Sequence, residues 1–240
     1  KSRTATLFVQ WVLGKYPKDK VITGSYNETL STVFSKGVRN KIQERSADDR
    51  IVYSDIFPNT KVKRGDGAAN LWGLEGNDTN SYLATSPTGT ATGFGADLML
   101  IDDLIKNEYE ARNDNIKEQH FKWFIDTMLS RREGKRKVII VMTRWASDDL
   151  AGRVMETLDR QGKKYRLICY KAFDNGKMLC DDILNLAQYN DILNGDTGKD
   201  IVEANYNQSP IDIQGRLYTT LQTYEELAKN IESIDSYTDT

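Results

Sequence analysis

The chain has 240 residues, with 33 basic and 35 acidic side chains and a formal net charge of −2. This length suits one large α/β domain, or one domain and part of another, and the charge excludes a generic basic nucleic-acid binder. The single histidine, His120, is expected on a helix surface, and Cys169 and Cys180 lack metal-ligand spacing, so the composition argues against a zinc site and against most histidine-based triads.

The first third of the chain predicts a helix, a short strand, a second helix and a β-rich region. These elements cover residues 3–15, residues 21–24, the stretch from the Ser25 cap to about residue 44, and residues 50–87. Pro17 ends the first helix, and the spacing of Ser25 and Glu28 is that of a capping box that opens the second. Turn-forming pairs that contain Gly, Pro or Asn divide the β-rich region.

The rest of the chain alternates between strand and helix patterns. We predict strands within 96–103, 138–142 and 166–173, and helices over 107–132, 147–160 and, with interruptions, 181–207. Ser147 is the expected N-cap of the helix at 147–160, with Asp148 and Asp149 in its first turn. Strands without polar residues that alternate with helices predict an α/β fold, with a mainly parallel sheet flanked by helices.

The strand within 96–103 runs through four apolar residues directly into Asp102 and Asp103. In open α/β sheets, ligands bind at the carboxyl ends of the strands. Two adjacent carboxylates are costly to hold together unless a cation lies beside them, and a Mg²⁺-nucleotide supplies one. The pattern is that of a Walker B strand, although a buried strand that ends in a polar turn explains it equally well when it is taken alone.

The chain opens on Lys1-Ser2 directly before a predicted helix. These are the residues that end a Walker A loop, where the lysine reaches the β- and γ-phosphates and the hydroxyl binds Mg²⁺. The helix N-terminus would add free N–H groups to phosphate binding. The loop glycines are not in this chain, and a Lys-Ser pair carries weight only in this context.

The strand at 138–142 ends in Thr143-Arg144-Trp145, at the edge of the sheet where the strand carrying Asp102 also ends. A hydroxyl at this position can sense the γ-phosphate, and an arginine can pair with phosphate. The alternative is a capped strand end with Arg144 in a structural ion pair. Trp145 is expected in the core.

Several stretches together resemble the large subunit of a tailed-bacteriophage terminase, the DNA-packaging motor. They are Ser25-Tyr26-Asn27-Glu28-Thr29-Leu30, Thr92-Gly93-Phe94-Gly95-Ala96-Asp97, the acid pair, Thr143 to Arg153, Tyr206-Asn207-Gln208-Ser209-Pro210 and Gly215-Arg216-Leu217-Tyr218. The stretch from Thr143 to Arg153 is the most specific. The resemblance implies that the chain is a piece of a longer protein, and that this piece covers most of the ATPase domain.

This resemblance implies a P-loop ATPase of the additional-strand catalytic-glutamate (ASCE) type, joined to an RNase H-like nuclease. Carried over by position, Lys1 and Ser2 bind ATP, Ser2 and Asp102 bind Mg²⁺, Asp103 is the catalytic acid, and Thr143 and Arg144 form the coupling motif. Asp239 resembles the first metal-binding acid of the nuclease, with an ordinary tail acid as the alternative. Many related ATPases have Glu where this chain has Asp103.

The implied domains are the ATPase at 1–208, a linker at 209–233 and the start of the nuclease at 234–240. The implied function is ATP-driven packaging of double-stranded viral DNA into a procapsid and cleavage of concatemers, with the fragment itself expected to be inactive. The implied partners are double-stranded DNA, a terminase small subunit, a portal protein and other copies of the chain, which form a ring on the capsid. The implied location is the host cytoplasm, and no membrane is implied.

Two other functions stay open from the sequence. One is another ASCE-class DNA translocase or helicase, which the acids downstream of Asp239 would distinguish. The other is a catalytically inactive prophage remnant that acts as a DNA-binding or assembly module. Basic clusters, which could contact phosphates, lie at Lys61, Lys63 and Arg64 and at Arg131, Arg132, Lys135, Arg136 and Lys137.

Overall fold

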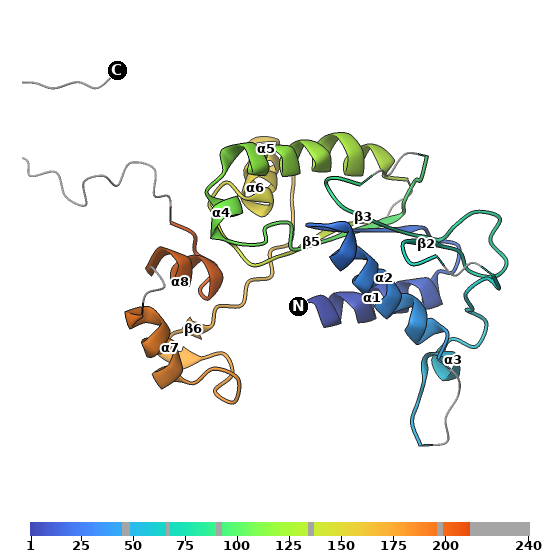
Figure 1. Ribbon diagram of the computed structural model, residues 1–240, viewed down its shortest axis with the longest axis horizontal. Helices are drawn as coiled ribbons and strands as arrows, with labels where there is room; N and C mark the ends of the chain where they lie inside the picture. Colours follow the sequence, from blue (N-terminus) through green and yellow to red (C-terminus); the bar gives the residue numbers. More distant parts are fainter. Residues whose placement is uncertain (45–48, 66–67, 90–92, 134–136, 196–198, 212–240) are drawn as a thin grey trace, which may run out of the picture.

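The computed structural model describes residues 1–44, 49–65, 68–89, 93–133, 137–195 and 199–211. Its centre is a five-stranded sheet in the order β2-β3-β1-β4-β5 (Figure 1). The strands are β1 (Val21–Ser25), β2 (Leu71–Trp72), β3 (Tyr82–Thr85), β4 (Leu98–Asp102) and β5 (Val138–Val141). β3, β1, β4 and β5 are parallel, and β2 is antiparallel to β3. The prediction of a mainly parallel sheet is confirmed.

Helices cover both faces of the sheet, which explains why the middles of β4 and β5 are entirely apolar. α1 (Ser2–Lys15) and α2 (Glu28–Ile42) pack on one face, and α5 (Asp114–Lys122), the π-helix η1 (Trp123–Met128) and α6 (Leu150–Arg160) lie on the other (Figure 1). Alternate residues of β4 serve the two cores: Leu98 and Leu100 face α1 and α2, whereas Met99 and Ile101 face Trp123 and Phe124. A strand buried on both sides has no polar face.

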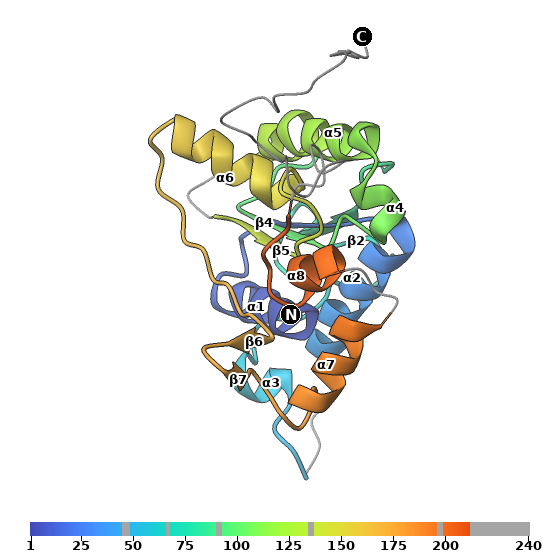
Figure 2. The same cartoon turned by 90° about the vertical axis from the view of Figure 1, so that its left-hand side faces the viewer.

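The remaining elements are short and lie around this framework. They are α3 (Tyr53–Ile56), α4 (Glu108–Ala111), the 3-10 helix η2 (Leu129–Arg131), the hairpin of β6 (Phe173–Asp174) and β7 (Lys177–Met178), α7 (Leu186–Asn194) and α8 (Lys199–Asn205). In Figure 2, α7 and α8 lie together, with the N-terminus of the chain drawn between α8 and α1. Within the described ranges, no helix is long and apolar enough to cross a membrane.

Two helices begin later than their sequence patterns predict. The N-cap of α2 is Asn27, whose side chain accepts a hydrogen bond from the Leu30 amide, because Ser25 is the last residue of β1. The N-cap of α6 is Asp149 rather than Ser147, and it accepts from the Gly152 amide. In both cases the predicted cap lies outside the helix, so a second polar residue takes its place.

The helix predicted over 107–132 is broken into several pieces. Asn113 caps α5 separately from α4, and the helix continues as η1 and η2. The surface position expected for His120 is wrong, since its side chain is 8% exposed and lies on the same buried face of α5 as Lys117.

The strand predicted over 166–173 does not form, apart from Phe173 at its end. Leu167 and Ile168 are more than 60% exposed, and 164–172 belong to no strand. Apolar composition predicts a strand, but a strand also needs a neighbour for its backbone groups. The β-rich region at 50–87 is likewise reduced to β2, β3 and an isolated bridge from Val62 to Leu74. The linker at 209–233, beyond residue 211, and the nuclease start at 234–240 lie outside the described residues.

Gly24 of β1 leaves room for the indole of Trp123, and an added Cβ would lie 2.6 Å from that ring. We predict that Gly24→Ala lowers the free energy of unfolding by about 1–3 kcal/mol, because a buried rigid ring cannot move aside cheaply. Urea denaturation measures the change. The matched control is Gly37→Ala in α2, where the nearest atom is 3.8 Å away and the helix should gain about 0.5–1 kcal/mol. Equal effects at the two glycines would contradict this account of the core.

Candidate functional site

Polar residues gather where the parallel strands end. β3 ends at Thr85, β1 at Ser25 and β4 at Asp102, and Ser25 and Asp102 are direct register partners. Asp103 follows β4, and Thr143 lies just beyond β5. Parallel strands present their carboxyl ends at one edge, which is where open α/β sheets bind ligands.

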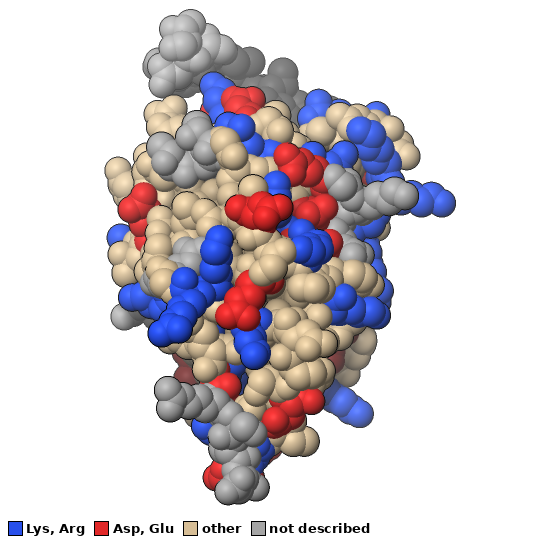
Figure 3. Space-filling view, turned by 90° about the vertical axis from the view of Figure 1, so that its right-hand side faces the viewer, with Lys and Arg blue, Asp and Glu red and all other residues tan. Residues whose placement is uncertain are grey.

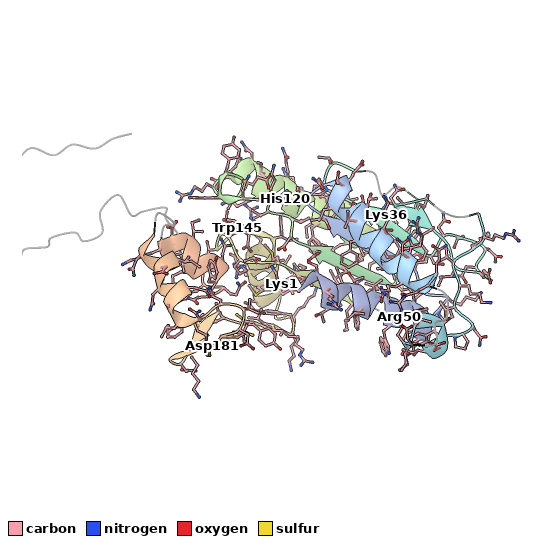
Figure 4. The ribbon with its side chains drawn as sticks, turned by 60° about the horizontal axis from the view of Figure 1, so that its bottom comes forward. Lys1, Lys36, Arg50, His120, Trp145 and Asp181 are labelled. Atoms are coloured by element: carbon pink, nitrogen blue, oxygen red, sulfur yellow. The ribbon has the colours of Figure 1, made fainter. Side chains whose placement is uncertain are left out.

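Three side chains from distant parts of the chain meet at this edge. Lys1 Nζ lies 3.3 Å from Asp103 Oδ2 and also donates to Thr143 Oγ1. The Thr143 amide donates to Asp103 Oδ1 at 2.9 Å. Asp103 adopts a left-handed backbone conformation with φ of 43°, which aspartate tolerates better than most residues. Figure 4 labels Lys1 at the start of α1 and Trp145 in the turn after β5.

The Lys1 and Asp103 side chains are 46% and 31% exposed, so a ligand can reach both. Lys1 is also the N-cap of α1, and its side chain makes no capping bond. The first N–H groups of a helix have no intrahelical partner, and the helix dipole favours an anion there. A phosphate at this edge would therefore meet both an ammonium and a helix N-terminus.

Asp102 differs from its neighbour, because it is buried to 4% exposure and its Oδ1 has no hydrogen-bond partner. Burial raises the pKa of its carboxyl group above the ordinary value. A hydrogen bond from the Ser2 side chain and the charge of Lys1 lower this pKa, whereas Asp103 raises it. An unpartnered carboxylate oxygen beside a hydroxyl is a pair of hard oxygen donors of the kind that Mg²⁺ prefers.

These donors do not form an all-protein metal cage. Among the described residues, no group of three or more His, Cys, Asp or Glu side chains could hold a metal ion. Mg²⁺ bound through Ser2 and Asp102 would need phosphate oxygens or water as its other ligands, which is its usual habit at nucleotide sites.

The guanidinium of Arg144 contacts α6 and the turn before it. Its Nε lies 2.8 Å from Asp149 Oδ2, and its Nη2 donates to the carbonyl oxygens of Ala146 and Ser147. Asp149 is fully buried and also accepts from the Trp145 and Gly152 amides. This is the structural ion pair that the sequence left open as the alternative for Arg144.

Within the stretch from Thr143 to Arg153, the tight turn before α6 requires a glycine at position 152. A Cβ at Gly152 would lie 1.8 Å from the Ser147 carbonyl oxygen, so the turn before α6 has room only for glycine. The backbone thus folds tightly around the buried Asp149.

The structure brings together Lys1, Ser2, Asp102, Asp103 and Thr143, and it places the Arg144 backbone beside them. Asp239 lies outside the described residues. Sequence reasoning gave no separate role to Asp149 or Gln208. The Oε1 of Gln208 accepts the Arg144 amide at 3.1 Å. Gln208 lies within Tyr206 to Pro210, one of the stretches that resemble terminase large subunits, and this position was the one feature of the sequence that pointed to it.

The described surface offers no continuous basic face in the view of Figure 3, where Lys and Arg are interspersed with Asp and Glu. Lys61, Lys63 and Arg64 are exposed, as is Arg132, while Lys135 and Arg136 lie outside the described residues.

Asp102 makes a specific contribution to the pH dependence of stability. Because its pKa is raised on folding, the folded state holds a proton that the unfolded state has lost, and stability falls as pH rises from the ordinary value of 3.8 through the raised pKa. We therefore predict that the wild type loses stability relative to Asp102→Asn over this range, as measured by thermal unfolding without nucleotide.

Glu118→Gln is the control with the opposite sign. Arg153 holds the pKa of Glu118 below its ordinary value, so the wild type should gain stability relative to this variant as pH rises towards 4.5. If the stability of the wild type and that of Asp102→Asn changed with pH in parallel, burial would not raise the pKa of Asp102.

Removing either partner of the Arg144–Asp149 pair should destabilise the chain. We predict a loss of about 3–5 kcal/mol for Arg144→Ala and for Asp149→Ala, because each leaves a desolvated charge without its partner. Denaturant titration measures the loss. Arg160→Ala in α6 is the control, since Arg160 and Glu156 form a surface pair that should contribute about 0–1 kcal/mol. An Arg144→Ala variant as stable as the wild type would contradict a structural role.

No protein-family model matches the chain, and no curated protein matches it at a significant level. Among solved structures, the large terminase of bacteriophage HK97 is similar over 85% of this chain, with a TM-score of 0.46 and 12% sequence identity. The chain spans 40% of the length of that terminase.

Proposed function

We propose that this chain is the ATPase part of a DNA-translocating motor that packages double-stranded viral DNA. The observation that carries the ATPase proposal is the meeting of Lys1, Asp103 and Thr143 at the carboxyl edge of the parallel sheet, beside the buried pair of Ser2 and Asp102. Phosphoryl transfer needs this combination of a cation, hydroxyls and two acids more than it needs covalent chemistry.

The residues fit ATP and Mg²⁺. Lys1 and the N-terminus of α1 would hold the β- and γ-phosphates, and Ser2 and Asp102 would hold the metal. The unpartnered Oδ1 of Asp102 is the feature that favours a cation, because an anionic oxygen without any partner is otherwise a pure cost of folding. Mg²⁺, when bound, supplies positive charge that neutralises the phosphate oxygens.

The chain's own residues would then act as follows. Asp103 orients the attacking water and accepts its proton, and the hydrogen bond from the Thr143 amide sets the orientation of its carboxylate. Lys1 moves from Asp103 to the phosphates, which frees the second carboxylate oxygen for water. The Thr143 hydroxyl, also released by Lys1, would then be free to hydrogen-bond to a phosphate oxygen.

The motor part of the proposal rests on the sequence stretches that resemble terminase large subunits. They support Thr143 and Arg144 as the coupling motif, here with Arg144 acting through the turn that it stabilises. These stretches also support Asp239 as a metal ligand of the nuclease. They further support a terminase small subunit and a portal protein as partners, and a ring of copies of the chain in the host cytoplasm.

We predict that Asp103→Asn in the gene product that carries this chain lowers ATP turnover by about 10²–10⁴-fold, because an amide cannot accept the proton of the attacking water. Asparagine tolerates the left-handed backbone and can still accept the Thr143 amide, so nucleotide binding should stay within a few-fold of wild type. Steady-state hydrolysis with Mg²⁺ and titration of a fluorescent ATP analogue measure the two effects.

The control for this variant is Asp97→Asn, just before the other end of β4, where the carboxylate accepts the Lys20 amide. It should leave turnover unchanged. Wild-type turnover in Asp103→Asn would overturn the catalytic assignment. A gene product that binds DNA but shows no turnover at all would favour the inactive-module alternative, and hydrolysis driven by single-stranded rather than double-stranded DNA would favour a helicase.

A further inference from the structure

Gln208 links the end of β5 to the α7–α8 region through its side-chain amide. Its Oε1 accepts the Arg144 amide at 3.1 Å, and its Nε2 donates to the Asn205 carbonyl oxygen at 2.6 Å. Asn205 is the last residue of α8, where carbonyl groups lack intrahelical partners. One side chain therefore satisfies two backbone groups that belong to different parts of the fold.

The Arg144 amide is next in the chain to the Thr143 hydroxyl at the site. Beyond the end of β5, the strand ladder no longer supplies acceptors, and side-chain oxygens do so instead. The Thr143 amide donates to Asp103, and the Arg144 amide donates to Gln208. The peptide on each side of the Thr143 α-carbon is thus fixed by a different side chain.

The backbone at Gln208 is held in an unusual conformation. Its φ is 57°, in the left-handed region that non-glycine residues rarely adopt, so neighbouring contacts must maintain it. The Asn207 side chain donates to the Tyr189 hydroxyl at 2.9 Å, and the Ser209 amide donates to the Glu203 carbonyl oxygen at 2.8 Å. These contacts anchor the residues on either side and leave the Gln208 side chain aimed at β5.

We propose that Gln208 is a positioning residue for the nucleotide site, which it serves by holding the peptide after Thr143. This inference rests on the proposed ATP hydrolysis. A displacement of α8, or of the chain that leaves through Ser209 and Pro210, would reach Thr143 through this side chain. The salt bridge between Arg112 and Asp200 also joins α8 to the rest of the fold, but it contacts no residue of the site.

The test compares Gln208→Met, which removes both hydrogen bonds with little change in volume, and Gln208→Glu, which keeps an acceptor for the Arg144 amide. In Gln208→Met, kcat for ATP should fall about fivefold with KM within about twofold, since only one of the two lost hydrogen bonds, that to the Arg144 amide, lies next to the site. Gln208→Glu should restore kcat to within about twofold of wild type. The matched control is Gln188→Met, which removes the hydrogen bond that the Gln188 side chain accepts in the capping box of α7 and has no contact with Arg144.

Amide hydrogen exchange at Arg144 gives a second readout that needs no activity, and Gln208→Met should accelerate it about tenfold. Faster exchange with unchanged kcat would overturn the positioning role. An equal fall of kcat in Gln208→Met and Gln188→Met would also overturn it, because a general loosening of α7 and α8 would then suffice. A wild-type gene product without turnover would overturn the proposed function, and this role of Gln208 with it.

Discussion

The candidate site depends on the carboxylate of Asp103, which binds two other segments of the chain at once. Its Oδ1 accepts the Thr143 amide and its Oδ2 faces the ammonium of Lys1, which lies 102 positions away in the sequence. The parallel pairing of β4 with β5 brings the first two segments together, and α1 supplies the third. A sheet of the same composition with another strand order would separate them.

Adjacent carboxylates take different roles when their surroundings differ. Asp102 is buried, with a pKa raised by desolvation and an oxygen without a partner, whereas Asp103 is partly exposed and paired with Lys1. The first arrangement destabilises the ligand-free fold and favours a cation, and the second keeps a carboxylate accessible to water. Such a local cost to stability is typical of functional sites, where structure is retained for reasons other than folding.

The sequence was sufficient for the parallel strands β1, β4 and β5 and for the edge where β4 and β5 end, because both follow from short-range patterns. Unbroken apolar runs predicted strands buried on two faces, and acids or hydroxyls at their ends predicted a shared edge. Caps were misplaced where a strand or turn extended past the first polar residue, as at Ser25 and Ser147. The strand at 166–173 failed because backbone pairing depends on neighbours, and the contact between Arg144 and Gln208 joins residues 64 positions apart that no local pattern connects.

The end of β5 is held by a buried cluster of contacts on one side and by single hydrogen bonds on the other. Towards α6, the buried Asp149 fixes the Arg144 guanidinium and the amides of Trp145 and Gly152, and Gly152 leaves no space for another arrangement. Towards the site, Thr143 is held by single hydrogen bonds from Lys1 and to Asp103, and the following amide by Gln208. A change at the site can therefore break and remake single bonds around Thr143 while the turn before α6 stays fixed. Motion arising there would pass towards α8 rather than into α6.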